Sequence, residues 1–231
     1  MRKYEFTGET MVLEGRTLNR IRRIEDGLIG GWIESEKNLS HEGSCFVYDE
    51  AMVYENARVM DNAEVRGMAR VFGYSCVYGD AKVFEYSTIG GSACVYGKAT
   101  IREYSQVYGN AEIYDEALIC GYAQIHENAK VCGNAEVFQY ASIFGEALIS
   151  DEAKVYGFSN VYNCAQITEE ARVFEFSCIN GAYISGSVEV CGNAYICEDK
   201  IIYGEGEFKG VMYSSQTHDK TVIIGTARYS H

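Results

Sequence analysis

A small residue occupies every sixth position from Cys45 to Ser177, and an aliphatic residue follows two places later without a single insertion, as in Ala51 and Val53. A fixed short period is typical of repeat architectures, in which each unit stacks only on its neighbours. Within a hexad such as 135–140, side chains alternate inward and outward over four residues, as in a strand, and two turn residues follow. Each hexad therefore predicts one short strand and one corner.

A second period indicates how many corners close one turn. In every third hexad a large side chain comes just before the small residue, at Met68, Tyr86, Tyr104, Tyr122, Tyr140, Phe158 and Phe176. These positions are 18 residues apart, so three hexads make a turn with a triangular cross-section. The fold class predicted is all-β: a parallel β-helix solenoid built from a single chain, with about nine coils at the usual inter-strand spacing of about 4.8 Å.

The ends of the chain depart from the hexad rule. We divide the sequence into an N-terminal cap, 1–44, a β-helix, 45–197, and a C-terminal cap, 198–231, because solenoids need polar end pieces. Both caps are expected to be rich in strands, and Trp32 is expected to cover the open core. The hexad phase slips by one residue at Gly181, after which three weaker hexads follow.

Composition narrows the function. The formal net charge of −13 argues against direct binding to nucleic acid or to anionic membranes, because both require basic patches. No apolar stretch approaches the roughly 20 residues that span a bilayer, so we expect a cytoplasmic protein. The nine cysteines are odd in number, and seven of them occupy ordinary hexad positions. We expect no disulfide framework, no metal site and no cofactor.

Acidic residues collect at one corner of the predicted triangle. Stacked carboxylates of this kind bind calcium in some proteins, but solvation and protection against edge-to-edge association also explain them. A third reading is an acidic mimic of nucleic acid. The residues are Asp61, Asp80, Asp115, Glu116, Asp151, Glu152, Glu169 and Glu170.

The side of the triangle that follows the aromatic corner is the candidate binding surface, because Arg70 is its only fixed charge in a strongly acidic chain. A flat aromatic side with few charges favours an interface, and a homodimer is its simplest form. Scattered arginines are the cations available for a phosphate. The candidate residues are Phe72, Tyr86, Tyr104, Tyr108, Tyr122, His126, Tyr140, Phe144 and Tyr162, with Arg66, Arg70 and Arg102.

The strict alternation of Ala or Ser with Val or Ile over residues 45–197 resembles the hexapeptide-repeat proteins, which implies a left-handed parallel β-helix. The segment Gly-Gly-Trp-Ile-Glu-Ser-Glu at 30–36 is similar to a phage and prophage subgroup whose members are often labelled transferases by analogy. Many family members are acyltransferases with a catalytic histidine and an extruded loop. Here no hexad is interrupted, and glycine stands two places after the aliphatic residue instead of directly after it. Of the four histidines, only His126 lies in the regular coils.

These observations favour a non-enzymatic binding or inhibitor protein of phage or prophage type. Such a protein would work in the host cytoplasm, capturing a small ligand such as a nucleotide signal or blocking a host defence protein. Base stacking on tyrosines is one way to hold a nucleotide. Two alternatives remain open: an acyl-CoA-dependent acyltransferase that uses His126, and the acidic mimic of nucleic acid.

Overall fold

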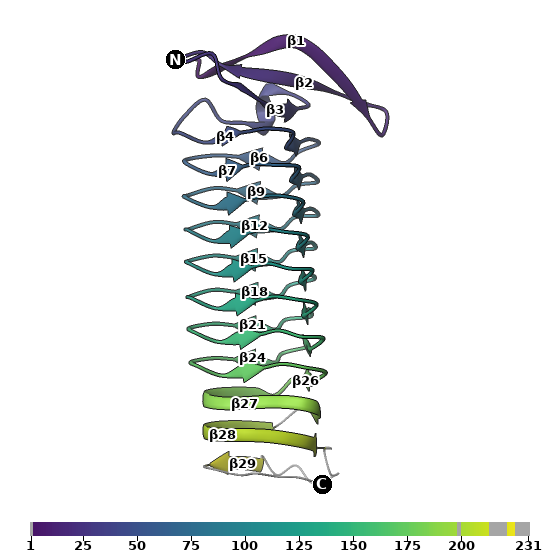
Figure 1. Ribbon diagram of the computed structural model, residues 1–231, viewed down its shortest axis with the longest axis vertical. Helices are drawn as coiled ribbons and strands as arrows, with labels where there is room; N and C mark the ends of the chain where they lie inside the picture. The colour runs from purple at the N-terminus through teal and green to yellow at the C-terminus, as the bar shows by residue number, and fades with distance from the viewer. Residues whose placement is uncertain (1, 198–199, 213–220, 225–231) are drawn as a thin grey trace. The chain divides into compact units, whose positions relative to one another are not determined.

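The computed structural model describes residues 2–197, 200–212 and 221–224. Parallel strands about 18 residues apart form a β-solenoid of about ten turns, where the sequence predicts about nine (Figure 1). Each turn consists of three hexads, as the two sequence periods predict. Contacts divide the chain into an N-terminal unit, Met1–Asp115, and a C-terminal unit, Glu116–His231. The described residues include one helical element, the 3₁₀ turn η1 (Glu36–Asn38).

The coils of the N-terminal unit have three sides, each a ladder of parallel strands in register. The first side contains β4 (Phe46–Val47), β7 (Glu64–Val65), β10 (Lys82–Val83) and β13 (Thr100–Ile101). The second side contains β5 (Met52–Val53), β8 (Arg70–Val71), β11 (Thr88–Ile89) and β14 (Gln106–Val107). The third side contains β6 (Arg58–Val59), β9 (Cys76–Val77), β12 (Cys94–Val95) and β15 (Glu112–Ile113).

The C-terminal unit repeats this arrangement. Its first side contains β16 (Leu118–Ile119), β19 (Glu136–Val137), β22 (Lys154–Val155) and β25 (Arg172–Val173). Its second side contains β17 (Gln124–Ile125), β20 (Ser142–Ile143), β23 (Asn160–Tyr162) and β26 (Cys178–Asn180). Its third side contains β18 (Lys130–Val131), β21 (Leu148–Ile149) and β24 (Gln166–Ile167).

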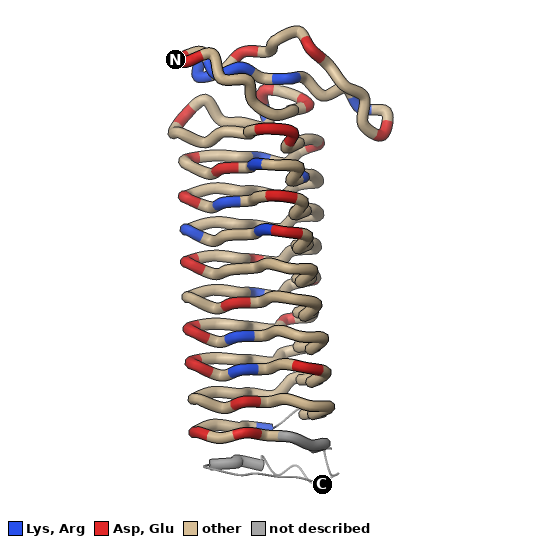
Figure 2. The backbone as a smooth tube through the Cα atoms, viewed as in Figure 1, with Lys and Arg blue, Asp and Glu red and all other residues tan. Residues whose placement is uncertain are grey.

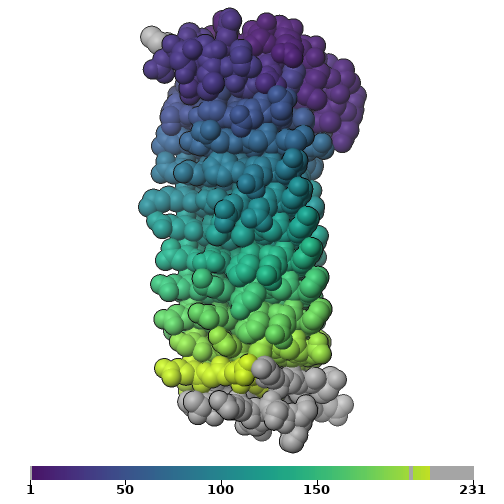
Figure 3. Space-filling model, in the orientation of Figure 1, coloured from purple at the N-terminus to yellow at the C-terminus, as the bar shows by residue number. Residues whose placement is uncertain are grey.

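The core lies inside the coils and consists of the small and aliphatic hexad residues. Ala93 and Val95, for example, are fully buried, and so are their counterparts in the other hexads. Each buried valine or isoleucine contributes about 1.5–3 kcal/mol relative to an exposed position. Residues on either side of the aliphatic one point outward, and in each unit their side chains stand in rows, turn by turn (Figure 3). The predicted alternation is therefore confirmed.

The fifth place of the hexad is a turn residue with positive φ in every hexad from Asp49 to Glu175. Glycine adopts this conformation without strain, and here it alternates with acidic or amide residues. Several of these side chains accept a hydrogen bond from the same place in the next coil. Glu85 Oε2, for example, accepts from the backbone N–H of Glu103 at 2.7 Å. Many of the acidic turn residues, red in Figure 2, thus occupy the turn positions that each coil requires.

An antiparallel hairpin precedes the coils. It consists of β1 (Tyr4–Leu13) and β2 (Arg16–Arg23), joined by a tight turn at Glu14 and Gly15, both with positive φ. Strand β2 pairs with β3 (Ile29–Ile33), which in turn pairs in parallel with β5 on the second side. This chain of pairings places the hairpin against the second side of the N-terminal unit.

The structure gives Trp32 a position other than the predicted one. It is the register partner of Met52, which points outward, and it packs with Leu18 and Tyr54 beneath the hairpin. Its indole N–H donates to Glu50 Oε2 at 2.9 Å. Ile33, the partner of the inward Val53, continues the core. Trp32 therefore anchors the hairpin to the outside of the coil instead of covering its open end.

The phase slip at Gly181 appears as a pairing offset of 17 residues, with Gln166 opposite Tyr183. Beyond it, the structure has long strands in place of short hexads: β27 (Tyr183–Ile196), β28 (Lys200–Met212) and β29 (Thr221–Ile224). Strand β28 pairs in parallel with β27, and β29 with β28. The described part of the expected C-terminal cap, 200–212 and 221–224, thus adds further parallel rungs. The remainder of that cap lies outside the described residues.

Candidate functional site

A cleft of about 390 Å³ lies on the second side of the N-terminal unit, where the hairpin turn approaches the coils. The outward positions of β5, β8 and β11 form its floor, because Met52, Arg70 and Thr88 are register partners on successive coils. The lining residues are Glu14, Met52, Tyr54, Glu55, Met68, Arg70, Phe72, Tyr86, Thr88 and Tyr108.

An aromatic ladder forms one wall of the cleft and is interrupted at Gly90. Tyr54 and Phe72, at the same hexad place one turn apart, stack with ring centroids 5.2 Å apart and an interplanar angle of 10°. The next place is Gly90, and Phe72 meets Tyr108 beyond it at 6.2 Å and 65°. A Cβ atom on Gly90 would lie 2.8 Å from Tyr108 Cε1 and 2.9 Å from Phe72 Cζ. The glycine thus lets two rings from non-adjacent coils incline toward each other.

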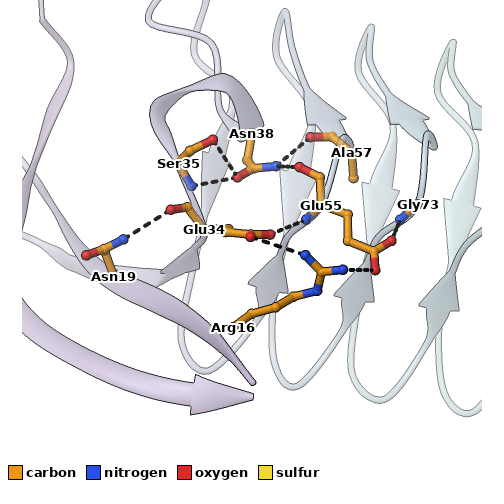
Figure 4. A network of polar contacts seen from close by, with 8 residues as sticks. All are labelled: Arg16, Asn19, Glu34, Ser35, Asn38, Glu55, Ala57 and Gly73. Atoms are coloured by element: carbon orange, nitrogen blue, oxygen red, sulfur yellow. Dashed lines mark hydrogen bonds and ion pairs between the residues drawn. The ribbon is translucent and has the colours of Figure 1, made fainter. Parts of the chain in front are cut away.

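A polar network fixes the hairpin to the coils beside this wall (Figure 4). Arg16, at the start of β2, bridges Glu34 Oε1 at 3.3 Å and Glu55 Oε1 at 2.9 Å. Glu34 Oε2 accepts from the backbone N–H of Glu55 at 2.6 Å, and Glu55 Oε2 accepts from Gly73 N–H at 2.8 Å. Both carboxylates are therefore held in place, and one rim of the cleft is rigid.

Asn38 completes this network from η1. Its Nδ2 donates to the backbone carbonyls of Glu55 at 3.1 Å and Ala57 at 2.9 Å, and its Oδ1 accepts from Ser35 N–H at 2.8 Å. The side chain is fully buried. A buried amide that satisfies three backbone groups fixes the loop before the first coil.

Arg70 is the cation of the cleft. It is exposed, and it makes no ion pair with any residue in the described ranges. Burial raises the pKa of Tyr54 and that of Tyr108, and the positive charge of Arg70 opposes both shifts. Glu14, on the hairpin turn, is also exposed. The cleft thus combines apolar rings with one guanidinium that forms no ion pair among the described residues, and with the carboxylates of Glu14 and Glu55.

The structure brings together four of the residues predicted from the sequence: Arg70, Phe72, Tyr86 and Tyr108. Tyr104 lies one turn beyond, stacked on Tyr86 with centroids 4.9 Å apart. Arg102 follows β13 on the first side, on the other side of the aromatic corner from Arg70.

Arg66 also follows a first-side strand, and its guanidinium already has partners. Its Nε donates to Glu64 Oε2 at 2.9 Å, and its guanidinium carbon lies 3.7 Å from the centroid of the Tyr48 ring. Of the three candidate arginines, Arg66, Arg70 and Arg102, only Arg70 lines the cleft.

Sequence reasoning missed the part of the cleft that comes from outside the regular hexads. Glu14 belongs to the hairpin turn, and Tyr54 and Glu55 follow β5, one coil before the candidate surface predicted from the sequence. The sequence holds one indication of the cleft, because Gly90 interrupts a series of outward residues that are otherwise bulky. The sequence holds no such indication of where the hairpin lies, because its position follows from the pairing of β2 with β3.

The remaining candidates form ladders in the C-terminal unit. His126, Phe144 and Tyr162 stack on the second side at 5.0 and 4.9 Å, with interplanar angles of 3° and 4°. Tyr122 and Tyr140 stack at the aromatic corner at 5.1 Å and 3°. In such stacks the ring faces cover one another and only the edges meet solvent. A base therefore has no free ring face along these ladders.

His126 has none of the partners that acyl transfer requires. Its ring stacks on Phe144, and among the described residues its side chain forms no hydrogen bond with a carboxylate, a serine or a cysteine. A general base needs an orienting partner and a nearby nucleophile or substrate position. His126 is therefore one ring of a stacked aromatic ladder.

Carboxylates at the acidic corner are engaged in the coil itself. Asp61 Oδ2 accepts from Gly79 N–H at 3.1 Å, and Asp151 Oδ2 accepts from Glu169 N–H at 3.2 Å. Within the described ranges, no group of three or more His, Cys, Asp or Glu is arranged to hold a metal ion. These contacts favour a structural role for this corner over nucleic-acid mimicry.

Comparison with known proteins adds no relative: no family model matches the chain, and no curated protein is similar to it. In the part of the chain that the structure describes, no helix is long and apolar enough to cross a membrane.

Proposed function

We propose that the protein is a non-enzymatic binding protein that captures a small, planar, anionic ligand in the cleft at the hairpin. The observation that carries this proposal is Arg70, an exposed cation that lies among aromatic side chains and forms no ion pair among the described residues, in a chain of net charge −13. An arginine binds a phosphate or carboxylate with two parallel, charge-assisted hydrogen bonds. Its guanidinium would supply the charge recognition, and the rings would supply the apolar contact.

A mononucleotide is the ligand that best suits this cleft. A volume of about 390 Å³ lies within the range of small-molecule sites, which are mostly apolar with a few oriented polar groups. The inclined rings of Phe72 and Tyr108 offer a face to a base, unlike the closed stacks elsewhere. The hydroxyl of Thr88 and the carboxylate of Glu14 line the same space and suit sugar or amide groups.

The likeness of residues 30–36 to phage and prophage proteins supports a more specific version of this proposal. A phage protein that binds a nucleotide without reacting with it removes that nucleotide from host signalling. The host cytoplasm would then be its place of action. A ligand held by stacking and one arginine needs no catalytic group, in keeping with the surroundings of His126.

Loss of the Arg70 charge is expected to weaken nucleotide binding at least about tenfold, because a hydrogen bond to a charged group contributes about 1.5–3 kcal/mol. We would titrate adenosine and guanosine monophosphates, linear and cyclic, into wild type and Arg70→Met by calorimetry. Native mass spectra of protein purified gently from expressing cells would report any retained nucleotide.

Arg58→Met is the matched control, because Arg58 is an exposed arginine on the third side of the same unit. It should bind as wild type does. The proposal would be overturned if none of these nucleotides bound, or if Arg70→Met bound as tightly as Arg58→Met.

We also propose that two copies associate through the second side of the C-terminal unit. The outward residues there carry no fixed charge, which makes this face the place where two acidic chains meet with least repulsion. They are Gln124, His126, Ser142, Phe144, Asn160, Tyr162, Cys178 and Asn180.

Phe144→Lys is expected to convert this dimer into a monomer, because it places a charge in the centre of the apolar ladder in each copy. Sedimentation velocity would measure the mass. The control is Phe138→Lys, since Phe138 stacks on Tyr156 in the first-side ladder at 4.7 Å, where Glu136 and Lys154 already bring charges. A monomeric wild type, or equal dissociation of both variants, would contradict the proposed interface.

A further inference from the structure

A second cavity, of about 510 Å³, lies in the N-terminal unit and shares no lining residue with the cleft. Its walls come from the residues just before β1, from the end of β2 and the residues that follow it, and from the loop between η1 and β4. The lining residues are Arg2, Lys3, Arg23, Ile24, Glu25, His41, Gly43 and Ser44. Three cations and a histidine thus surround one cavity in an acidic protein, with one carboxylate among them.

The two arginines are already paired, and the lysine is not. Arg2 meets Glu36 at 3.3 Å, and Arg23 meets Asp26 at 2.6 Å. Lys3 Nζ donates to the backbone carbonyls of Glu42 at 3.3 Å and Gly43 at 3.4 Å and lies 3.1 Å from Cys45 Sγ. These partners are neutral, and Lys3 forms no ion pair among the described residues, although Glu25 lines the same cavity.

His41 also lines this cavity, and one of its ring nitrogens is buried without a hydrogen-bond partner in the described ranges. Its Nδ1 accepts a hydrogen bond from the backbone N–H of Lys3 at 3.3 Å, which places the proton of the neutral ring on Nε2. Nε2 is buried and has no hydrogen-bond partner among the described residues. The ring is held by stacking on Tyr4, with centroids 4.3 Å apart. His41 and Lys3 line the same cavity, and an anion there could satisfy both the buried N–H and the ammonium, which forms no ion pair with any described residue.

We propose that this basic cavity binds a phosphate-type oxyanion through Lys3 Nζ and the Nε2–H of His41. The anion is either inorganic phosphate or the phosphate group of a small organic ester. An oxyanion would accept from both donors and compensate the Lys3 charge, while the Arg2 and Arg23 side chains line the approach. The site is independent of the cleft, so either can fail without the other.

The test is a titration of the whole protein, followed by the NMR signals of the His41 ring and the Gly43 amide. Inorganic phosphate is the first probe and adenosine monophosphate the second, both at ionic strength held constant with chloride. We expect saturable shifts with phosphate. Tighter binding of the monoester, with the same signals shifting, would assign the site to an organic phosphate.

Lys3→Met should weaken phosphate binding at least about tenfold. His41→Phe keeps the ring that stacks on Tyr4 but removes the donor, so it should also weaken binding and provides a second test if Lys3→Met fails to fold. Lys82→Met removes an equal charge from an exposed position on β10 and should bind as wild type. The proposal is overturned if wild type shows no saturable shift, or if Lys82→Met loses as much affinity as Lys3→Met.

Discussion

Replacing Asn38 with alanine is expected to lower the free energy of unfolding by about 3 kcal/mol, because buried backbone groups lose their partners at about 1–3 kcal/mol each. The groups affected are the carbonyls of Glu55 and Ala57 and the N–H of Ser35. Guanidinium-induced unfolding followed by circular dichroism would measure the loss. Faster amide exchange in the first coils of the N-terminal unit would locate it, since each turn of a solenoid contacts only its neighbours.

Asn62→Ala is the control for this experiment. Asn62 is also an asparagine in the N-terminal unit and donates to Asp80 Oδ1 at 3.0 Å, but it is exposed, so water replaces its lost partners. A loss below about 1 kcal/mol is expected. If the two variants lost equal stability, the Asn38 amide would not be the fixing point of the loop. Asn38→Ala should also loosen Glu55, and with it one rim of the cleft.

The coils could be predicted because their order has a single physical cause. A strand of two residues and a corner repeat every six residues, so inward and outward positions follow from counting alone, as Ala93, Cys94 and Val95 illustrate. The single-residue slip at Gly181 was also visible by counting, and the pairing of Gln166 with Tyr183 confirms it. Periodic structure is therefore recoverable from a periodic sequence.

The alternation of glycine and acidic residues at the turns was harder to interpret. Glycine two places after the aliphatic residue looked like a departure from the acyltransferases, yet this is the place where φ is positive. At the same place Glu85 and Asp61 accept backbone N–H groups of the next coil. Part of the negative charge of the chain is therefore a component of the turns and does not serve solvation alone. Charge alone could not reveal this, because it depends on backbone conformation.

The cleft could be predicted only in part. Arg70, Phe72, Tyr86 and Tyr108 follow from sorting outward residues by side, and Gly90 marks a gap between two of the rings. The hairpin that brings Glu14 to them is not periodic, and its position depends on the bridge from Arg16 to Glu34 and Glu55. Contacts between segments of unrelated sequence require the three-dimensional structure.

The inward and outward places of the hexad can be compared directly on β21, where Leu148 and Ile149 are adjacent and nearly equal in size. Ile149 is fully buried between Val131 and Ile167 on the neighbouring coils, whereas Leu148 is half-buried on the outer face. Ile149→Ala leaves a cavity in the continuous core, and we expect it to cost about 2–5 kcal/mol. Leu148→Ala should cost about 1 kcal/mol, since water fills the space it leaves. Chemical unfolding and amide exchange of the C-terminal unit would measure both losses. Equal losses would mean that the six-residue register does not define the core, and the assignment of every outward residue, including those of the cleft, would have to be revised.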